Sequence, residues 1–275
     1  IVEADSTPIT RYVNGDSGVD AGGCDSSENP CKNIQYAIMN AIAGDTIAVT
    51  GGVYKYVNVP DSGNVETPGQ VTPRQVILLS KAVNLSGGWD TTFNSQTGLS
   101  VLDAEHGRYG ISVSVPVGNV AEIDHFGIKN GTSGIYKFIG ELILKNSSIY
   151  WNDGIGLWNS QLSMTLENVT VSENAGAGIF NGGTTTITNS TISGNGNFGI
   201  NRLCGNITIR NTVVSGNGNG NSAYDCNGPI ISGDNNIISN TTNCAISPLP
   251  ADQFNVDPLL AAFLPSRGYQ PLQIN

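Results

Sequence analysis

The stretch NSTISGNGNFGIN, residues 189–201, recurs in altered form through the second half of the chain. Each copy opens with one asparagine and places a second asparagine six residues later. A period near 22 residues predicts a solenoid, in which each repeat is one coil that buries its apolar side chains against its neighbours. Successive copies are 21 or 22 residues apart, with first asparagines at Asn146, Asn168, Asn189 and Asn211 and second asparagines at Asn152, Asn174, Asn195 and Asn217.

The residues around each first asparagine alternate as in a β-strand and then break the alternation. In one coil Leu142 and Leu144 precede Asn146, and the next apolar residue, Ile149, follows three positions later. Each strand is therefore expected to bend at its asparagine, which tolerates the left-handed backbone of a tight bend. Side chains about 4.8 Å apart in stacked coils can also hydrogen-bond to each other. We expect a structural ladder of Asn146, Asn168, Asn189 and Asn211.

The composition restricts the kinds of partner. The 275 residues carry 12 lysines and arginines against 22 aspartates and glutamates, for a formal net charge of -10. A phosphate backbone would be repelled, so no nucleic acid partner is expected. No apolar run is long enough to cross a bilayer, so no transmembrane segment is expected either. Low charge together with many Gly, Asn and Thr residues is typical of exported β-rich proteins.

The five cysteines lack the C-x-x-C spacing of metal ligands, which favours disulfides in an oxidising compartment. Cys24 and Cys31 close a short loop. Cys204 and Cys226 each follow a first asparagine by 15 residues. They are therefore predicted to occupy equivalent places in adjacent coils and to form a disulfide. Cys244 then has no predicted disulfide partner.

Several stretches resemble a known family. LENVTVSENAGAGIFN (166–181) and ITNSTISGNGNFGIN (187–201) resemble coils of the right-handed parallel β-helix of the pectin-lyase-like fold. Residues 11–54, VNLSGGWDTTF (83–93), FNVDPLL (254–260) and GYQPLQIN (268–275) resemble secreted bacterial β-helix repeat proteins of the choice-of-anchor and polymorphic outer membrane protein type. The resemblance implies an all-β, right-handed parallel β-helix that is secreted or at the cell surface. It leaves the activity open, because this architecture carries lyases, hydrolases, epimerases, adhesins and tailspikes.

A single β-helix domain over residues 1–275 is expected to have three regions. Residues 1–45 form an N-terminal cap, in which residues 32–43 show helical spacing of apolar side chains. Residues 46–245 form the coils, and residues 246–275 form a C-terminal extension in which the repeat is lost. Residues 57–75, rich in Pro, Gly and Asn, are expected to project as a loop.

A column of charged residues directly precedes the bends. Outward side chains on stacked strands would place Asp124 and Glu167 about 9.6 Å apart with Lys145 between them. By resemblance to polysaccharide-cleaving β-helix enzymes, the candidate catalytic residues of a lyase or hydrolase are Asp124, Lys145, Glu167 and Arg210. Alternating charges are also what a solvated sheet face uses to avoid repulsion, and we favour that interpretation. His125 aligns with the first asparagines, and His106 is a weaker catalytic candidate beside Asp103, Glu105 and Arg108.

A column of aromatic residues offers a stronger candidate site. Tyr136, Trp158 and Phe180 are spaced by 22 residues, and each follows an apolar residue expected to point inward. Alternation then points all three rings outward on successive coils, as a platform for sugar rings or a protein contact. The alternative is that a loop covers them and they form peripheral core.

These observations favour a non-catalytic extracellular or cell-surface module that binds polysaccharide or another surface partner, or that assembles end to end with copies of itself. The alternative function is a polysaccharide lyase or glycoside hydrolase acting on an extracellular glycan. No metal or other cofactor is expected. The turns NDG and SGNGNGN could bind calcium, but they lack the acidic repeat of dedicated sites.

Overall fold

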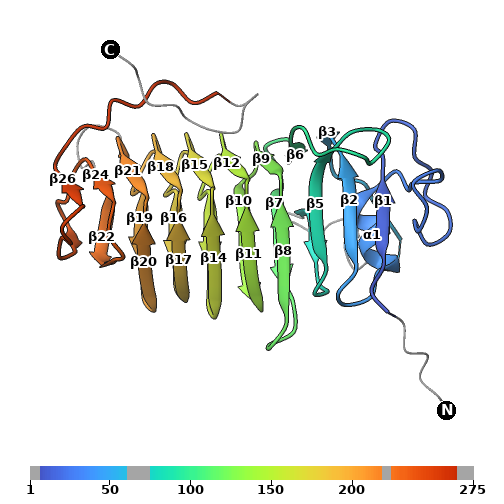
Figure 1. Cartoon of the computed structure of the whole chain (residues 1–275), viewed down its shortest axis with the longest axis horizontal. Helices are drawn as coiled ribbons and strands as arrows, with labels where there is room; N and C mark the ends of the chain where they lie inside the picture. Colours follow the sequence, from blue (N-terminus) through green and yellow to red (C-terminus); the bar gives the residue numbers. More distant parts are fainter. Residues whose placement is uncertain (1–6, 61–74, 219–223, 265–275) are drawn as a thin grey trace.

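The computed structural model describes residues 7–60, 75–218 and 224–264, and they form a parallel β-helix (Figure 1). Three sheets run along its length, and neighbouring strands in each sheet pair in parallel. One coil passes once through each sheet, as residues 141–159 do.

Sheet A contains, in spatial order, β1 (Thr10–Val13), β2 (Thr46–Thr50), β5 (Asn84–Trp89), β8 (Val120–Asp124), β11 (Glu141–Lys145), β14 (Ser163–Glu167), β17 (Thr184–Thr188), β20 (Asn206–Arg210) and β23 (Ile231–Ser232). Sheet B contains β3 (Gly52–Tyr54), β6 (Ser100–Asp103), β9 (Phe126–Lys129), β12 (Ser148–Tyr150), β15 (Thr170–Ser172), β18 (Thr191–Ser193), β21 (Val213–Ser215), β24 (Ile237–Ile238) and β26 (Gln253–Phe254). Sheet C contains β4 (Gln75–Leu79), β7 (Tyr109–Ser114), β10 (Ser133–Ile139), β13 (Leu157–Asn159), β16 (Ile179–Asn181), β19 (Ile200–Arg202), β22 (Cys226–Pro229) and β25 (Cys244–Ala245).

The core is made of columns of identical or similar apolar side chains. In sheet A, Leu144, Leu166, Ile187 and Ile209 pair in register from coil to coil, and all four are fully buried. Each such side chain stabilises the fold by roughly 1.5–3 kcal/mol relative to an exposed one. The alternation and the 22-residue period seen in the sequence are therefore the signature of this stacking, and the predicted parallel β-helix is confirmed.

The first asparagines lie in the turns between sheets A and B. Asn146, Asn168, Asn189 and Asn211 have φ values of 44°, 54°, 52° and 49°, and His125 takes the same left-handed conformation one coil earlier. Nδ2 of Asn168 donates to Asn146 Oδ1 at 2.8 Å, and Nδ2 of Asn211 donates to Asn189 Oδ1 at 3.0 Å. The backbone thus bends at these residues. The side chains of Asn168, Asn189 and Asn211 are exposed, however, so they do not support the core.

The second asparagines form a continuous ladder of side-chain hydrogen bonds inside the β-helix. Asn152 donates to Asn174, Asn174 to Asn195 and Asn195 to Asn217, at Nδ2···Oδ1 distances of 2.7, 2.9 and 2.8 Å. Asn217 donates in turn to the buried carboxylate of Asp225 at 2.9 Å. All five side chains are buried, and the ladder therefore satisfies polar groups that water cannot reach.

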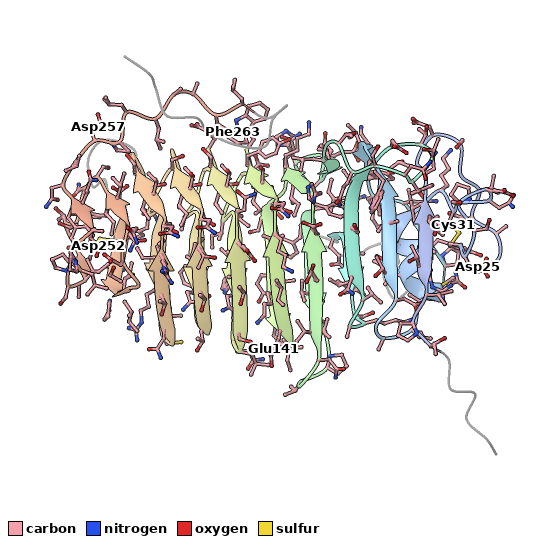
Figure 2. The ribbon with its side chains drawn as sticks, in the orientation of Figure 1. Asp25, Cys31, Glu141, Asp252, Asp257 and Phe263 are labelled. Atoms are coloured by element: carbon pink, nitrogen blue, oxygen red, sulfur yellow. A yellow bond between two sulfur atoms is a disulfide. The ribbon has the colours of Figure 1, made fainter. Side chains whose placement is uncertain are left out.

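Additional segments of the chain pack at both ends of the β-helix. Helix α1 (Ile34–Asn40) lies within the predicted residues 32–43 and packs against β1, β2 and β4. Strand β1 already pairs with β2 inside the region expected to be a cap, and β26 pairs with β24 inside the expected C-terminal extension. After β26 the chain turns back along sheet B, where the ring of Phe263 lies 5.0 Å from that of Tyr150 (Figures 1 and 2). Most of the predicted loop, residues 61–74, and the segment GYQPLQIN lie outside the described residues.

The predicted Cys204–Cys226 disulfide is wrong. Cys226 bonds to Cys244 on the neighbouring strand, with Cα atoms 5.2 Å apart, and Cys204 is free and exposed. Between Asn217 and Cys226 the chain has four more residues than between Asn195 and Ile200. Because of this longer turn, Cys226 pairs with Ile200 and takes an inward place in the core. The Cys24–Cys31 disulfide is confirmed.

Candidate functional site

The outer face of sheet C carries a column of aromatic rings. Tyr136 pairs in register with Trp158, and Trp158 with Phe180. Their ring centroids are 5.1 and 5.0 Å apart, and all three side chains are half-buried. The residue before each ring is a fully buried Ile or Leu, so strand alternation turns the rings outward. We call these three residues the aromatic column.

A further ring and a pair of amides lie beyond the two ends of the aromatic column. The ring of Tyr109 stacks on that of Tyr136 at 5.5 Å with an interplanar angle of 14°. At the other end Phe180 pairs with Asn201, whose Oδ1 accepts from Asn227 Nδ2 at 3.0 Å. A strip of rings followed by amides can stack against sugar rings and hydrogen-bond their hydroxyls.

The charged column lies on the outer face of sheet A, and two of its members, Asp124 and Lys145, have ion-pair partners. Asp124, Lys145, Glu167 and Thr188 pair in register, and Arg210 follows. Lys145 Nζ lies 3.0 Å from Glu122 Oε2, and this hydrogen bond raises the pKa of Lys145 above its ordinary value. Proton abstraction at neutral pH needs an amine whose pKa is lowered, so Lys145 is poorly suited to act as a base. Asp124 accepts a 2.8 Å hydrogen bond from Asn146 Nδ2 and lies 2.9 Å from His125 Nδ1.

The turns that connect sheets B and C carry a second group of polar residues. We call residues 104–108, 130–132 and 151–156 the B–C corner. Both carboxylate oxygens of Asp153 lie 3.0 Å from His106 Nδ1, and both side chains are exposed. Arg108 Cζ lies 4.2 Å from the centroid of the Tyr56 ring, which is a cation–π contact. The corner thus brings His106 next to Asp153, a residue that sequence spacing did not connect with it.

The family model for the right-handed β-helix region matches residues 92–251, which is more than half of the chain. The chain belongs to the right-handed β-helix family. No curated protein matches this β-helix protein in sequence.

Solved structures resemble this β-helix protein at low sequence identity. A pectate lyase, Pel9A, is 17% identical, with 90% of this chain and 74% of that chain covered and a TM-score of 0.52. A rhamnogalacturonan lyase is 13% identical over 83% of this chain and 74% of that chain, with a TM-score of 0.43. The A-module of an Azotobacter vinelandii mannuronan C-5 epimerase is 14% identical over 81% and 77%, with a TM-score of 0.44. Likeness at this level concerns the fold alone.

Two further properties concern metals and membranes. Within residues 7–60, 75–218 and 224–264, no three His, Cys, Asp or Glu side chains are grouped so that they could hold a metal ion. No helix in the same residues is long and apolar enough to span a membrane. The two disulfides are consistent with an extracellular protein.

The buried Lys137 is a polar residue that the sequence analysis missed. Its side chain is fully buried, and Nζ donates to Asn159 Oδ1 at 3.0 Å and to the carbonyl oxygen of Gln161. Asn159 donates in turn to Asn181 Oδ1 at 3.1 Å. The sequence does indicate that this side chain points inward. Successive members of the set Lys137, Asn159 and Asn181 are 22 positions apart, and each lies two positions after an inward apolar residue.

Proposed function

We propose that this chain is an extracellular or cell-surface β-helix module that binds polysaccharide along the aromatic column without cleaving it. The observation that carries the proposal is the row of half-exposed rings 5.0–5.5 Å apart on one outer face. This repeat is close to the length of one sugar unit, so consecutive units of an extended glycan can meet consecutive rings. The structural likeness to a pectate lyase is compatible with a glycan partner.

Catalysis on sheet A is less well supported. Two of the four charged candidates, Asp124 and Lys145, have partners on the same face, and the pKa of Lys145 is raised, not lowered. End-to-end assembly also has less support than glycan binding. Helix α1 packs on strands at one end, and the last strands at the other end, β23, β25 and β26, are two residues long, which leaves little edge for pairing with another copy.

The test replaces the central ring of the aromatic column. Trp158→Ala should weaken binding to the recognised polysaccharide by about fivefold to tenfold, because one stacking contact contributes about 1–1.5 kcal/mol. Trp158→Phe keeps a ring and should bind within a few fold of the natural protein. Val117→Ala, at an exposed apolar side chain in the turn after β7, is the control and should bind normally.

Binding is measured by affinity electrophoresis and calorimetry over a panel of neutral and acidic polysaccharides, with a parallel assay for new reducing ends and unsaturated uronate. Equal binding by Trp158→Ala and the natural protein would contradict the role of the aromatic column. Product formation that is lost in Glu167→Gln would contradict the absence of catalysis and would locate an active face on sheet A.

A further inference from the structure

The B–C corner contains a large exposed aromatic residue in an unfavourable backbone conformation. Trp151 is 47% exposed and has a φ of 51°. The equivalent position on the preceding coil is Asn130, and on the following coils it is Glu173, Gly194 and Gly216. All four have positive φ. Asn and Gly are the residues that this conformation favours, whereas a bulky side chain there costs about 1 kcal/mol or more. The fold alone would be better served by Asn or Gly at position 151.

The exposed indole contacts a buried aromatic ring. Its ring lies 5.3 Å from that of Tyr150 at an interplanar angle of 73°, an edge-to-face contact. Tyr150 is itself buried and contacts Phe263 from the C-terminal segment. Trp151 therefore offers to solvent an aromatic surface that a buried ring supports along one edge, which reduces the side-chain entropy lost when a ligand binds.

Polar groups lie within reach of this surface. The backbone connects three coils, because Asn130 N donates to Trp151 O at 3.1 Å and His106 N donates to Asn130 O at 2.6 Å. His106 and Trp151 are thus two rungs apart, or about 9.6 Å. Asp153, two residues after Trp151, spans the middle rung to reach His106. An exposed indole and an exposed imidazole–carboxylate pair that begins on the same coil are the groups that bind a sugar, the indole by stacking on its face and the pair by hydrogen bonds with its hydroxyls.

The charges at the corner indicate that the sugar is uncharged. Lys55 pairs with Glu105 at 2.7 Å, Lys129 Nζ lies 3.4 Å from Asp103, and Arg108 lies on the ring of Tyr56. The described lysines and arginine in the corner and beside it, Lys55, Arg108 and Lys129, are therefore already engaged within the protein. The formal net charge of -10 adds a long-range repulsion of anionic ligands.

We propose that the B–C corner is a second carbohydrate site, separate from the aromatic column, in which Trp151 stacks on one ring of a neutral sugar and the Asp153–His106 pair binds its hydroxyls. The site uses a different aromatic residue and a different part of the surface, so it stands whether or not the aromatic column binds polysaccharide.

The test uses the three tryptophans, Trp89, Trp151 and Trp158, as reporters. Their indole N–H resonances are assigned in a ¹⁵N-labelled sample with Trp151→Phe and Trp158→Phe variants. The ligands are disaccharides of gluco, galacto and manno configuration and, for each, the matching disaccharide with one uronate. At least one neutral disaccharide should shift the Trp151 resonance, and its uronate counterpart should bind at least several fold more weakly.

Variants separate the corner from the aromatic column. Trp151→Gly removes the ring, restores the residue that the backbone favours and should lower affinity for the neutral disaccharide by about tenfold. Asp153→Asn should weaken it as well, and Trp158→Ala should leave it unchanged. The proposal is overturned if no neutral disaccharide shifts the Trp151 resonance, if the uronate binds equally well, or if Trp151→Gly binds normally while its thermal unfolding shows a folded protein. Failure of the aromatic column would instead show as a Trp158 resonance that no polysaccharide shifts.

Discussion

At the scale of single residues, Lys137 shows how burial changes the properties of one side chain. Burial lowers the pKa of Lys137 from 10.5 to about 8, although its amino group donates to Asn159 and Gln161. In the unfolded chain the amine keeps its ordinary pKa, so between these two values the unfolded state binds more protons than the folded state. The free energy of unfolding contributed by Lys137 therefore rises with pH across this window, by up to about 1.4 kcal/mol per pH unit.

This predicts a pH-dependent difference between the natural protein and Lys137→Met. The natural protein should gain stability relative to the variant from about pH 8 to about pH 10, as measured by urea unfolding at several pH values. Lys145→Met is the matched control: Glu122 raises the pKa of Lys145, so its contribution should stay flat over the same range. A flat difference for Lys137→Met would mean that the buried amine is not desolvated as the structure indicates.

At the scale of elements, the two sets of asparagines show what periodicity can and cannot predict. Both sets recur with the same spacing, so the period identifies the coils but does not say which set points inward. That choice depends on the left-handed turns at Asn146 and at Trp151, which redirect the chain twice in each coil. The first set marks the bend that the sequence predicted. The second set, which includes Asn152 and Asn195, supplies the buried hydrogen bonds.

The ladder predicts unequal costs for two asparagine substitutions. Asn195→Ala removes the hydrogen bonds that Asn195 Oδ1 accepts from Asn174 N and Nδ2 and the one that its Nδ2 donates to Asn217 Oδ1, all of them buried, and should cost about 3 kcal/mol in the free energy of unfolding. Asn168→Gly removes an exposed side chain and keeps a residue suited to positive φ, so it should cost less than about 1 kcal/mol. Urea unfolding of both variants measures the difference. Similar losses for both would contradict the division into a buried and an exposed set.

At the scale of the whole molecule, the sequence predicted the features that repeat and missed those that do not. The sheets and the aromatic column follow from a regular period, because each coil stacks on an equivalent one. The sequence indicated His106 and Arg108 as candidates but not the link from His106 to Asp153 and Trp151. The turns 104–108, 130–132 and 151–156 differ in length, so no period relates these residues. The disulfide error has the same cause, since a four-residue longer turn moved Cys226 out of the expected place.

The Cys226–Cys244 disulfide leads to a prediction about cooperativity along the molecule. It closes a loop with a sequence separation of 18 residues and should stabilise the last coils by roughly 3 kcal/mol. In a solenoid each coil contacts only its neighbours, so the loss of this bond should act locally. In Cys244→Ser we expect faster hydrogen exchange in β22 to β26 and unchanged exchange in β10 to β16, as measured by mass spectrometry. Cys204→Ser, at the free and exposed cysteine, is the matched control and should leave both regions unchanged. Faster exchange in every coil of Cys244→Ser would show instead that the β-helix unfolds as one cooperative unit, so that the C-terminal coils also protect the face that carries the aromatic column.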